Sequence, residues 1–371
     1  MIEEVIEAFK NKDYQTAARL LRQLAQDEPN NPWVQIYIAH LHEVKQQLKE
    51  AETIYRKLLI DSTNPKIISQ ARQGLKRLET IEKEERKQAL NQANADPNNQ
   101  QFGVLLLEPI DPQNKSNAAK TLAKIMQIDP YTARLQLPTR GWRIYRTGPV
   151  GELQFYASSL QSGSIPCFWV KLVDIQNINI FNVKYFSESN SIKTTIICQN
   201  PHGEVGSLTF NWSEVTQSVE GRLPLFEQVV DVDARHKLQR KTKTLDYINF
   251  CDLHLPARKS ILRINDLQYQ FQQGIRLSSK TENTQNGAIK IPILSQATNR
   301  INWNKLRNFI NLQLPQIPIW SDFTSFAETA IDYKEMLSRL PAHIDLLRRE
   351  ETPWDSAFQL YSGLAFLKNT Y

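Results

Sequence analysis

The sequence predicts a multidomain α+β protein in which helices begin and end the chain and strands dominate its middle. Three observations carry this prediction: a 34-residue repeat near the start, alternating strand and helix patterns over residues 102–175, and period-two alternation over much of 176–277. The 371 residues suffice for two or three domains of roughly 100–200 residues each. The predicted regions are N-terminal helical hairpins (1–80), a helical extension and linker (81–101), a small β-α-α-β-α-β module (102–175), a β-rich, barrel-like module (176–277), a polar loop and connector (278–301) and a helical C-terminal region (302–371).

The N-terminal region repeats residues of similar type 34 positions apart. The pairs are Val5/Ala39, Ala17/Ala51, Leu21/Tyr55 and Leu24/Leu58. Small residues suit places where two helices approach closely, larger ones fill the space between helices, and Pro29 ends one helix before the next begins. We therefore expect two helical hairpins, with Ile68–Leu78 as a further amphipathic helix that covers the last apolar face.

This pattern resembles the tetratricopeptide repeat family over about residues 1–65, with a capping helix to about residue 80. Two positions depart from the family: Val5 stands where a small residue is usual, and Thr63 stands where the second repeat would carry proline. The resemblance implies a concave surface that holds a peptide or a partner protein, with Gln35, Tyr37 and His40 as candidate partner-binding residues. The alternative is a pair of ordinary helical hairpins without repeat ancestry.

Residues 102–172 alternate between strand and helix patterns. The strands are Phe102–Leu107, Gly141–Arg146 and Ser164–Leu172, and the helices are Ser116–Ile128, Tyr131–Leu137 and Glu152–Ser162. A three-stranded sheet with helices on one face would bury their apolar residues. In topology alone the order resembles the C-terminal domain of the ribosomal stalk protein and the ClpS-type protease adaptors. That resemblance implies protein binding and carries over no functional residue.

Short strand patterns continue from about Ile178. The candidates are Asn182–Phe186, Ser191–Cys198, Gly206–Phe210, Gln228–Asp233, Tyr247–Leu253, Ser260–Asn265 and Gln268–Gln273, with a short helix or loop near 212–220. Many short strands favour a barrel or sandwich, and their number resembles the pleckstrin-homology barrel. After the polar loop Ser278–Gly287, helices are expected at Trp303–Leu314, Asp322–Leu340, Ala342–Arg349 and Trp354–Leu367.

Positive charge is concentrated in one place. The formal net charge is +6, and the stretch 234–243 holds five basic residues and no acidic one: Arg235, Lys237, Arg240, Lys241 and Lys243. The stretch is either a solvated loop or helix face, or an anion-binding site for an anionic membrane surface or a nucleic acid. It contains no aromatic residue, which disfavours single-stranded nucleic acid as the ligand.

No motif for catalysis, metal binding or cofactor binding stands out. The chain lacks a glycine-rich phosphate loop and a GxSxG motif, and we expect its three widely spaced cysteines, Cys167, Cys198 and Cys251, to be buried. Asp252 and His254 share one face of a predicted strand, and we interpret them as a structural pair rather than a catalytic one. We therefore predict a non-enzymatic protein with no cofactor, no metal and no evident small-molecule substrate.

The termini and hydropathy bear on localisation. No apolar run approaches the ~18 residues of a membrane-spanning helix, and Met1–Glu4 lacks the basic start of a signal peptide. We expect a cytoplasmic protein, peripheral at a membrane if the basic stretch binds lipid. The chain is similar overall to uncharacterised tetratricopeptide repeat proteins of cyanobacterial type. Together these features predict an adaptor or scaffold that binds a protein partner in the assembly or regulation of a larger complex.

Overall fold

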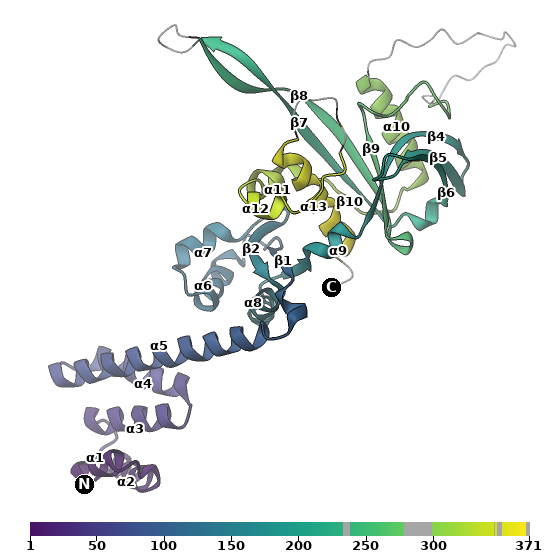
Figure 1. Ribbon diagram of the computed structural model, residues 1–371. Helices are drawn as coiled ribbons and strands as arrows, with labels where there is room; N and C mark the ends of the chain where they lie inside the picture. The colour runs from purple at the N-terminus through teal and green to yellow at the C-terminus, as the bar shows by residue number, and fades with distance from the viewer. Residues whose placement is uncertain (233–237, 278–298, 345, 347–350, 369–371) are drawn as a thin grey trace, which may run out of the picture. The chain divides into compact units, whose positions relative to one another are not determined.

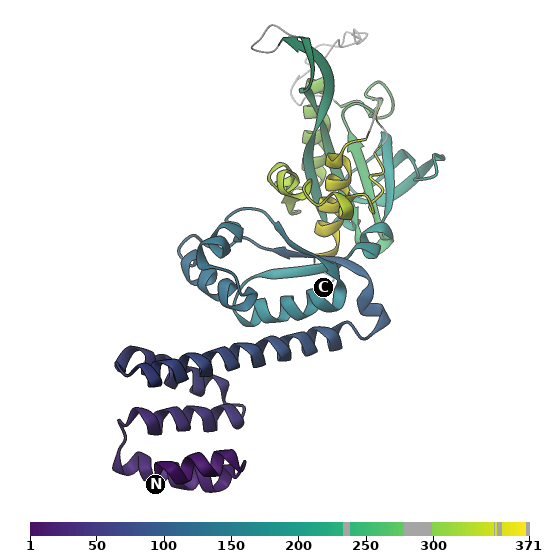
Figure 2. The ribbon, with the colours of Figure 1, turned by 60° about the vertical axis from the view of Figure 1, so that its left-hand side comes forward.

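The computed structural model describes residues 1–232, 238–277, 299–344, 346 and 351–368 (Figures 1 and 2). The chain forms two compact units, residues 1–92 and residues 93–371. Unit 1 is helical, and unit 2 contains both sheets of the described chain.

Unit 1 is a stack of helices, several of which begin at a local sequence signal. The helices are α1 (Ile2–Lys10), α2 (Tyr14–Asp27), α3 (Pro32–Val44), α4 (Leu48–Asp61) and α5 (Pro65–Ala93) (Figure 1). The Asp13 side chain accepts a hydrogen bond from the backbone N–H of Thr16 and so caps α2. Pro32 occupies the first turn of α3, where its missing N–H leaves no bond unmade. The predicted hairpins are present, and the covering helix is longer than the predicted Ile68–Leu78.

The repeat pairs mark the contact positions of unit 1. All eight residues of the four predicted pairs are buried. Seven of them, all except Ala17, belong to two apolar clusters, one around Val5 and Leu21 and the other around Tyr55 and Ile67. Gly74 of α5 lies directly against the Tyr55 ring, because a Cβ at position 74 would stand 2.4 Å from Tyr55 Cζ. The close approach of α4 and α5 therefore requires glycine at this position.

Unit 2 begins with the predicted small module. Its elements are η1 (Pro97–Gln100), β1 (Phe102–Leu107), α6 (Lys115–Met126), α7 (Pro130–Gln136), β2 (Arg143–Pro149), α8 (Val150–Ser162), β3 (Cys167–Lys171) and α9 (Leu172–Gln176). Strand β1 lies between β2 and β3 and pairs antiparallel with both. Val104–Leu107 are fully buried, as expected for a central strand covered on both faces. The predicted β-α-α-β-α-β order is confirmed.

A seven-stranded mixed sheet follows, in the order β10-β7-β8-β9-β4-β5-β6. The strands are β4 (Asn179–Ser189), β5 (Lys193–Gln199), β6 (Val205–Asn211), β7 (Gln217–Val232), β8 (Leu238–Leu255), β9 (Ser260–Asn265) and β10 (Ile319–Trp320). β9 pairs parallel with β4, and β10 pairs parallel with β7. The edge strands β10 and β6 do not pair with each other in the described residues, so the sheet is open and the predicted pleckstrin-homology-like barrel is not confirmed. A strand count does not reveal pairing order, and pairing order decides closure.

Three predicted segments of this region differ in the structure. β7 begins at Gln217, far before the predicted Gln228–Asp233, so the end of the expected helix or loop over 212–220 is strand, after a single short helix η2 (Trp212–Glu214). Part of the basic stretch is strand β8 rather than loop or helix. The predicted strand Gln268–Gln273 is absent, because Asn265 Oδ1 accepts the Gln268 N–H and turns the chain at the end of β9.

C-terminal helices cover both faces of the seven-stranded sheet. They are α10 (Asn299–Gln313), α11 (Phe323–Ala330), α12 (Lys334–Leu337) and α13 (Pro353–Leu367). Ile248 and Phe250 of β8 pack in the cluster that contains α11, α12 and α13, whereas Cys251 and Leu253 pack with α10. Polar residues of β8 that alternate with Cys251 and Leu253 therefore point toward α13 and into the core.

Two predicted helices of this region are interrupted. The expected Asp322–Leu340 helix divides into α11 and α12, and the Tyr333 hydroxyl between them donates to the carbonyl of Ile144. Residues 342–344 of the expected Ala342–Arg349 helix are not helical, because His343 has a φ of 52°, outside the right-handed helical region. The Ala342 carbonyl accepts a hydrogen bond from Arg263. Most of the rest of that predicted helix, like the predicted loop Ser278–Gly287, lies outside the described residues.

Candidate functional site

An aromatic patch made by Phe9, Tyr37 and His40 joins α1 and α3. The His40 ring stacks on Phe9 with 4.8 Å between centroids and 8° between planes, and the Tyr37 ring lies 5.5 Å from Phe9. Both Tyr37 and His40 are half-buried. Burial lowers the pKa of His40 and raises the pKa of Tyr37, so both side chains are neutral near pH 7. The patch is therefore flat, aromatic and uncharged.

Gln35, the third predicted partner-binding residue, does not belong to this patch. Its Nε2 donates to the Pro29 carbonyl at 2.7 Å and ties α3 to the turn before it. Side chains two positions apart on a helix do not face each other, which separates Gln35 from Tyr37. The structure thus brings two of the three residues together and gives the third a local structural contact.

A buried carboxylate links three helices of unit 1. Glu43 of α3 accepts a 2.5 Å hydrogen bond from the hydroxyl of Tyr55 in α4. Arg77 of α5 donates to both carboxylate oxygens of Glu43, through Nε at 3.0 Å and Nη2 at 2.8 Å. The Glu43 side chain is 7 % exposed and that of Arg77 is 47 % exposed. This bidentate pair holds α3, α4 and α5 in register and keeps a cationic group at the surface.

Part of the predicted anion-binding stretch lies on a two-stranded ribbon, defined here as residues 222–232 and 238–249 of β7 and β8. The ribbon extends away from the rest of the sheet in both views (Figures 1 and 2). Arg235 and Lys237 lie outside the described residues. Arg240, Lys241 and Lys243 lie on β8 and are exposed.

The three described basic residues do not share one face of the ribbon. Successive side chains of a strand point to opposite faces, so Arg240 lies on one face and Lys241 and Lys243 lie on the other. Lys243 also stands directly opposite Glu227 of β7, which partly neutralises its charge. The ribbon therefore does not present these charges as a single patch, and anion binding stays a prediction.

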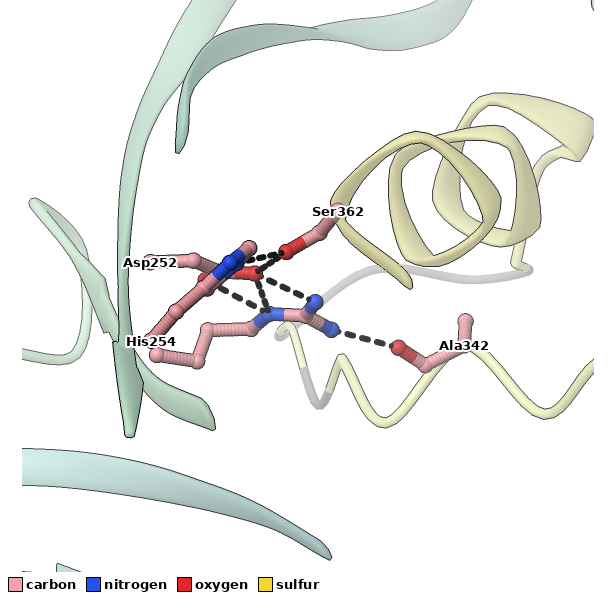
Figure 3. Close-up of polar contacts among 5 residues, drawn as sticks. Asp252, His254, Ala342 and Ser362 are labelled. Atoms are coloured by element: carbon pink, nitrogen blue, oxygen red, sulfur yellow. Dashed lines mark hydrogen bonds and ion pairs between the residues drawn. The ribbon is translucent and has the colours of Figure 1, made fainter. Parts of the chain in front are cut away.

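Asp252 and His254 lie on the face of β8 that packs against α13, where they form a polar cluster with Ser362 (Figure 3). Ser362 Oγ is 2.6 Å from Asp252 Oδ2 and 3.0 Å from His254 Nε2. Arg263 of β9 donates to Asp252 Oδ2 at 2.8 Å and to the Ala342 carbonyl at 2.7 Å. Asp252, His254, Arg263 and Ser362 are all fully buried. The cluster contains the three residue types of a hydrolase triad.

Gln217 determines which nitrogen of His254 carries the proton. The indole N–H of Trp320 can only donate, so the Gln217 atom 2.9 Å from it is the amide oxygen. The Gln217 amide nitrogen then faces two acceptors, the Ala365 carbonyl at 2.7 Å and His254 Nδ1 at 3.0 Å. His254 accepts at Nδ1 and therefore carries its proton on Nε2.

This proton arrangement is the opposite of the one that a hydrolase needs. His254 Nε2 donates to Ser362, and Ser362 donates to Asp252, so the imidazole is not placed to take the proton of the serine. Burial lowers the pKa of His254 to about 4, which keeps the ring neutral. The cluster joins α13 to the sheet. This arrangement agrees with the interpretation of Asp252 and His254 as structural rather than catalytic residues.

Sequence reasoning missed the other members of this cluster. Ser362 lies 110 residues from Asp252, and Gln217 lies 148 residues from the carbonyl it binds in α13. One local signal was available: Arg263 interrupts an otherwise apolar run, with Leu262 and Ile264 beside it. A cation in a buried strand requires an acceptor, but the sequence does not say which one.

Other chemistry-bearing groups are buried or dispersed. The three cysteines are buried and unpaired, as predicted, and burial raises the pKa of Cys167 and Cys198 to about 11. Among the residues that the structure describes, no group of three or more His, Cys, Asp or Glu side chains could hold a metal ion. None of the helices in that part of the chain is both long and apolar enough to cross a membrane.

In a comparison with protein families, residues 8–73 match the tetratricopeptide repeat. The matched segment runs from the end of α1 into α5, and so contains all of α2, α3 and α4 and three of the four repeat pairs. No curated protein and no solved structure matches the chain. The predicted N-terminal repeats are therefore confirmed.

Proposed function

Because residues 8–73 are tetratricopeptide repeats, a class of module that binds protein partners, we propose that this chain is a non-enzymatic adaptor whose unit 1 holds a partner protein. In this proposal the adaptor assembles or regulates a larger complex. Unit 1 binds the partner and so recruits it to unit 2. The repeat match is the observation that carries this proposal.

The aromatic patch is the part of unit 1 that we assign to the partner. Tyr37 and His40 present flat, uncharged rings that are held in place by Phe9. The half-exposed Arg77 adds a cation held in place by Glu43. Rigid aromatic and arginine side chains are enriched among the residues that dominate binding energy at protein interfaces. A partner segment with an apolar side chain followed by a carboxylate would satisfy both features.

The non-enzymatic part of the proposal rests on the buried cluster. Asp252, His254 and Ser362 form a Ser–His–Asp grouping, but His254 carries its proton on Nε2, and this nitrogen therefore cannot act as the catalytic base for Ser362. Their complete burial also keeps substrate away from Ser362.

A comparative pull-down tests the proposal. The full chain, its His40→Ala variant and a Lys57→Ala control on the exposed face of α4 are used as baits, with folding checked by circular dichroism. We expect one or more proteins whose recovery falls by about tenfold with His40→Ala and is unchanged with Lys57→Ala, since an interface residue in a central position carries that much affinity. Recovery that is equal for all three baits would refute the assignment to the patch.

A further inference from the structure

A cavity opens between the base of the ribbon and the start of α10. Its volume is about 600 Å³, within the roughly 300–1,000 Å³ typical of small-ligand sites. Its walls come from β7, β8, the turn after β9 and the first turns of α10. A smaller cavity of about 190 Å³ shares four of its lining residues, Arg222, Asn249, Trp303 and Arg307.

Three arginines line the larger cavity. Arg307 of α10 pairs with Glu220, and its Nε is buried without a hydrogen-bond partner. Arg222 of β7 lies over the Tyr247 ring, with 5.7 Å from the guanidinium carbon to the ring centroid. Neither Arg222 nor Arg300 forms an ion pair within the described ranges of the chain. Guanidinium groups without a carboxylate partner beside a cavity favour an anionic ligand.

Flat and apolar residues also line the cavity. Trp303 of α10 is buried, and Ile248 (buried) and Leu225 (partly buried) line it from the ribbon strands. Tyr247 is 50 % exposed, so its ring is accessible for stacking. An arginine over an aromatic ring is an arrangement on which a second flat, electron-rich group can stack.

Two carboxylates stand at the same cavity in defined positions. Asp266 accepts hydrogen bonds from Asn249, from its backbone N–H at 3.1 Å and its Nδ2 at 2.5 Å. Asp246 accepts the backbone N–H of Tyr247 at 2.7 Å. Each carboxylate keeps lone pairs for further donors, such as ligand hydroxyl or amino groups.

We propose that this cavity binds a nucleoside phosphate. The phosphate group lies between Arg222 and Arg300, and the base stacks on Tyr247. Ribose hydroxyls and exocyclic amines donate to Asp246 and Asp266. An inorganic anion would leave the apolar lining uncovered and meet two carboxylates, and an aliphatic acid would offer those carboxylates no donor. This inference uses unit 2 alone and does not depend on the proposed role of unit 1.

Calorimetric titration of the full chain tests the proposal with four probes: ADP, GDP, adenosine and inorganic phosphate. We expect ADP or GDP to bind with a Kd below about 100 μM, and adenosine and phosphate to bind at least about tenfold more weakly, because each fills only part of the site. Absence of binding by both nucleotides up to about 1 mM overturns the proposal. Phosphate that binds as tightly as the nucleotides also overturns it.

Variants separate this site from general attraction to basic residues. Arg222→Gln should raise the Kd about tenfold or more, the loss expected for one charge-assisted contact. Arg240→Gln on the exposed ribbon is the matched control and should leave the Kd unchanged. Tyr247→Phe should retain binding, whereas Tyr247→Ala should lose it. Arg300→Gln replaces the first variant if circular dichroism shows that Arg222→Gln misfolds, and equal effects of the cavity variant and Arg240→Gln overturn the proposal.

Discussion

Gly74→Ala provides a direct test of how the helices of unit 1 are held together. The added Cβ would stand 2.4 Å from Cζ and 2.5 Å from Cε2 of Tyr55. The Tyr55 ring cannot move aside easily, because it is 1 % exposed and its hydroxyl is bonded to Glu43. Either the ring shifts and breaks that hydrogen bond, or α5 moves away from α4.

The size of the effect follows from three terms. Overpacking a filled core costs about 1–3 kcal/mol. Loss of the hydrogen bond between Tyr55 and the charged Glu43 adds about 1.5–3 kcal/mol. In the opposite direction, alanine in place of glycine stabilises a helix by about 1 kcal/mol. Together these terms span about 1.5–5 kcal/mol, and we expect a net destabilisation near the middle of that span, about 2–4 kcal/mol, in unit 1.

Native-state hydrogen exchange of the full chain, resolved by peptide, measures this change where it occurs. Protection of peptides from α4 and α5 should fall roughly 30- to 700-fold, and peptides from unit 2 should be unaffected. The same Gly74→Ala change in a Tyr55→Leu background should instead stabilise by up to about 1 kcal/mol, because the ring atoms are gone and helix propensity remains. Equal destabilisation in both backgrounds would refute the reasoning.

Three further predictions concern unit 2. Ser362→Ala removes the donor to Asp252 and the acceptor for His254. It should lower the free energy of unfolding by about 1–3 kcal/mol, measured by urea titration with tryptophan fluorescence. An unchanged urea midpoint would contradict the hydrogen bonds described for Ser362. Burial lowers the pKa of His254 from 6.5 to about 4. Between these two pH values the ring is protonated in the unfolded chain but neutral in the folded one. The free energy of unfolding should therefore fall as pH drops from 6.5 toward 4, by up to about 1.4 kcal/mol per pH unit. His254→Gln should remove most of that slope. Replacing Lys241 and Lys243 by Gln should change binding to anionic vesicles or duplex DNA less than about twofold, because Lys243 stands opposite Glu227 and Arg240 lies on the other face of the ribbon. A salt-dependent loss of binding in co-sedimentation would instead support the anion-binding alternative.

Elements that bury an apolar face against near neighbours were predictable. The 34-residue repeat placed Ala17, Ala39 and Ala51 at helix contacts, and all three are buried. The small module followed its predicted order because each of its strands and helices has its own periodicity. Tyr37 and His40 were also placed on a common surface, although the Phe9 ring that holds them was not foreseen.

The ribbon and the sheet order were not predictable in the same way. Residues 238–247 of β8 have no buried face, so their sequence carries no alternation that would predict a strand. The barrel prediction rested on the number of strands, and a count of strands cannot show that β9 pairs with β4 in parallel. Gln268–Gln273 alternated like a strand, yet the side chain of Asn265 turned the chain away.

The sequence by itself determined the repeats, the strand–helix order of the small module and the burial of the cysteines, because apolar periodicity and residue size act between residues close along the chain. Only the tertiary structure decided that α13 reaches His254 through Ser362, that Gln217 sets the proton position on that ring, and that arginines of β7 and α10 meet at one cavity. These contacts join residues far apart in sequence, and their partners are chosen by the packing of whole elements rather than by any local pattern.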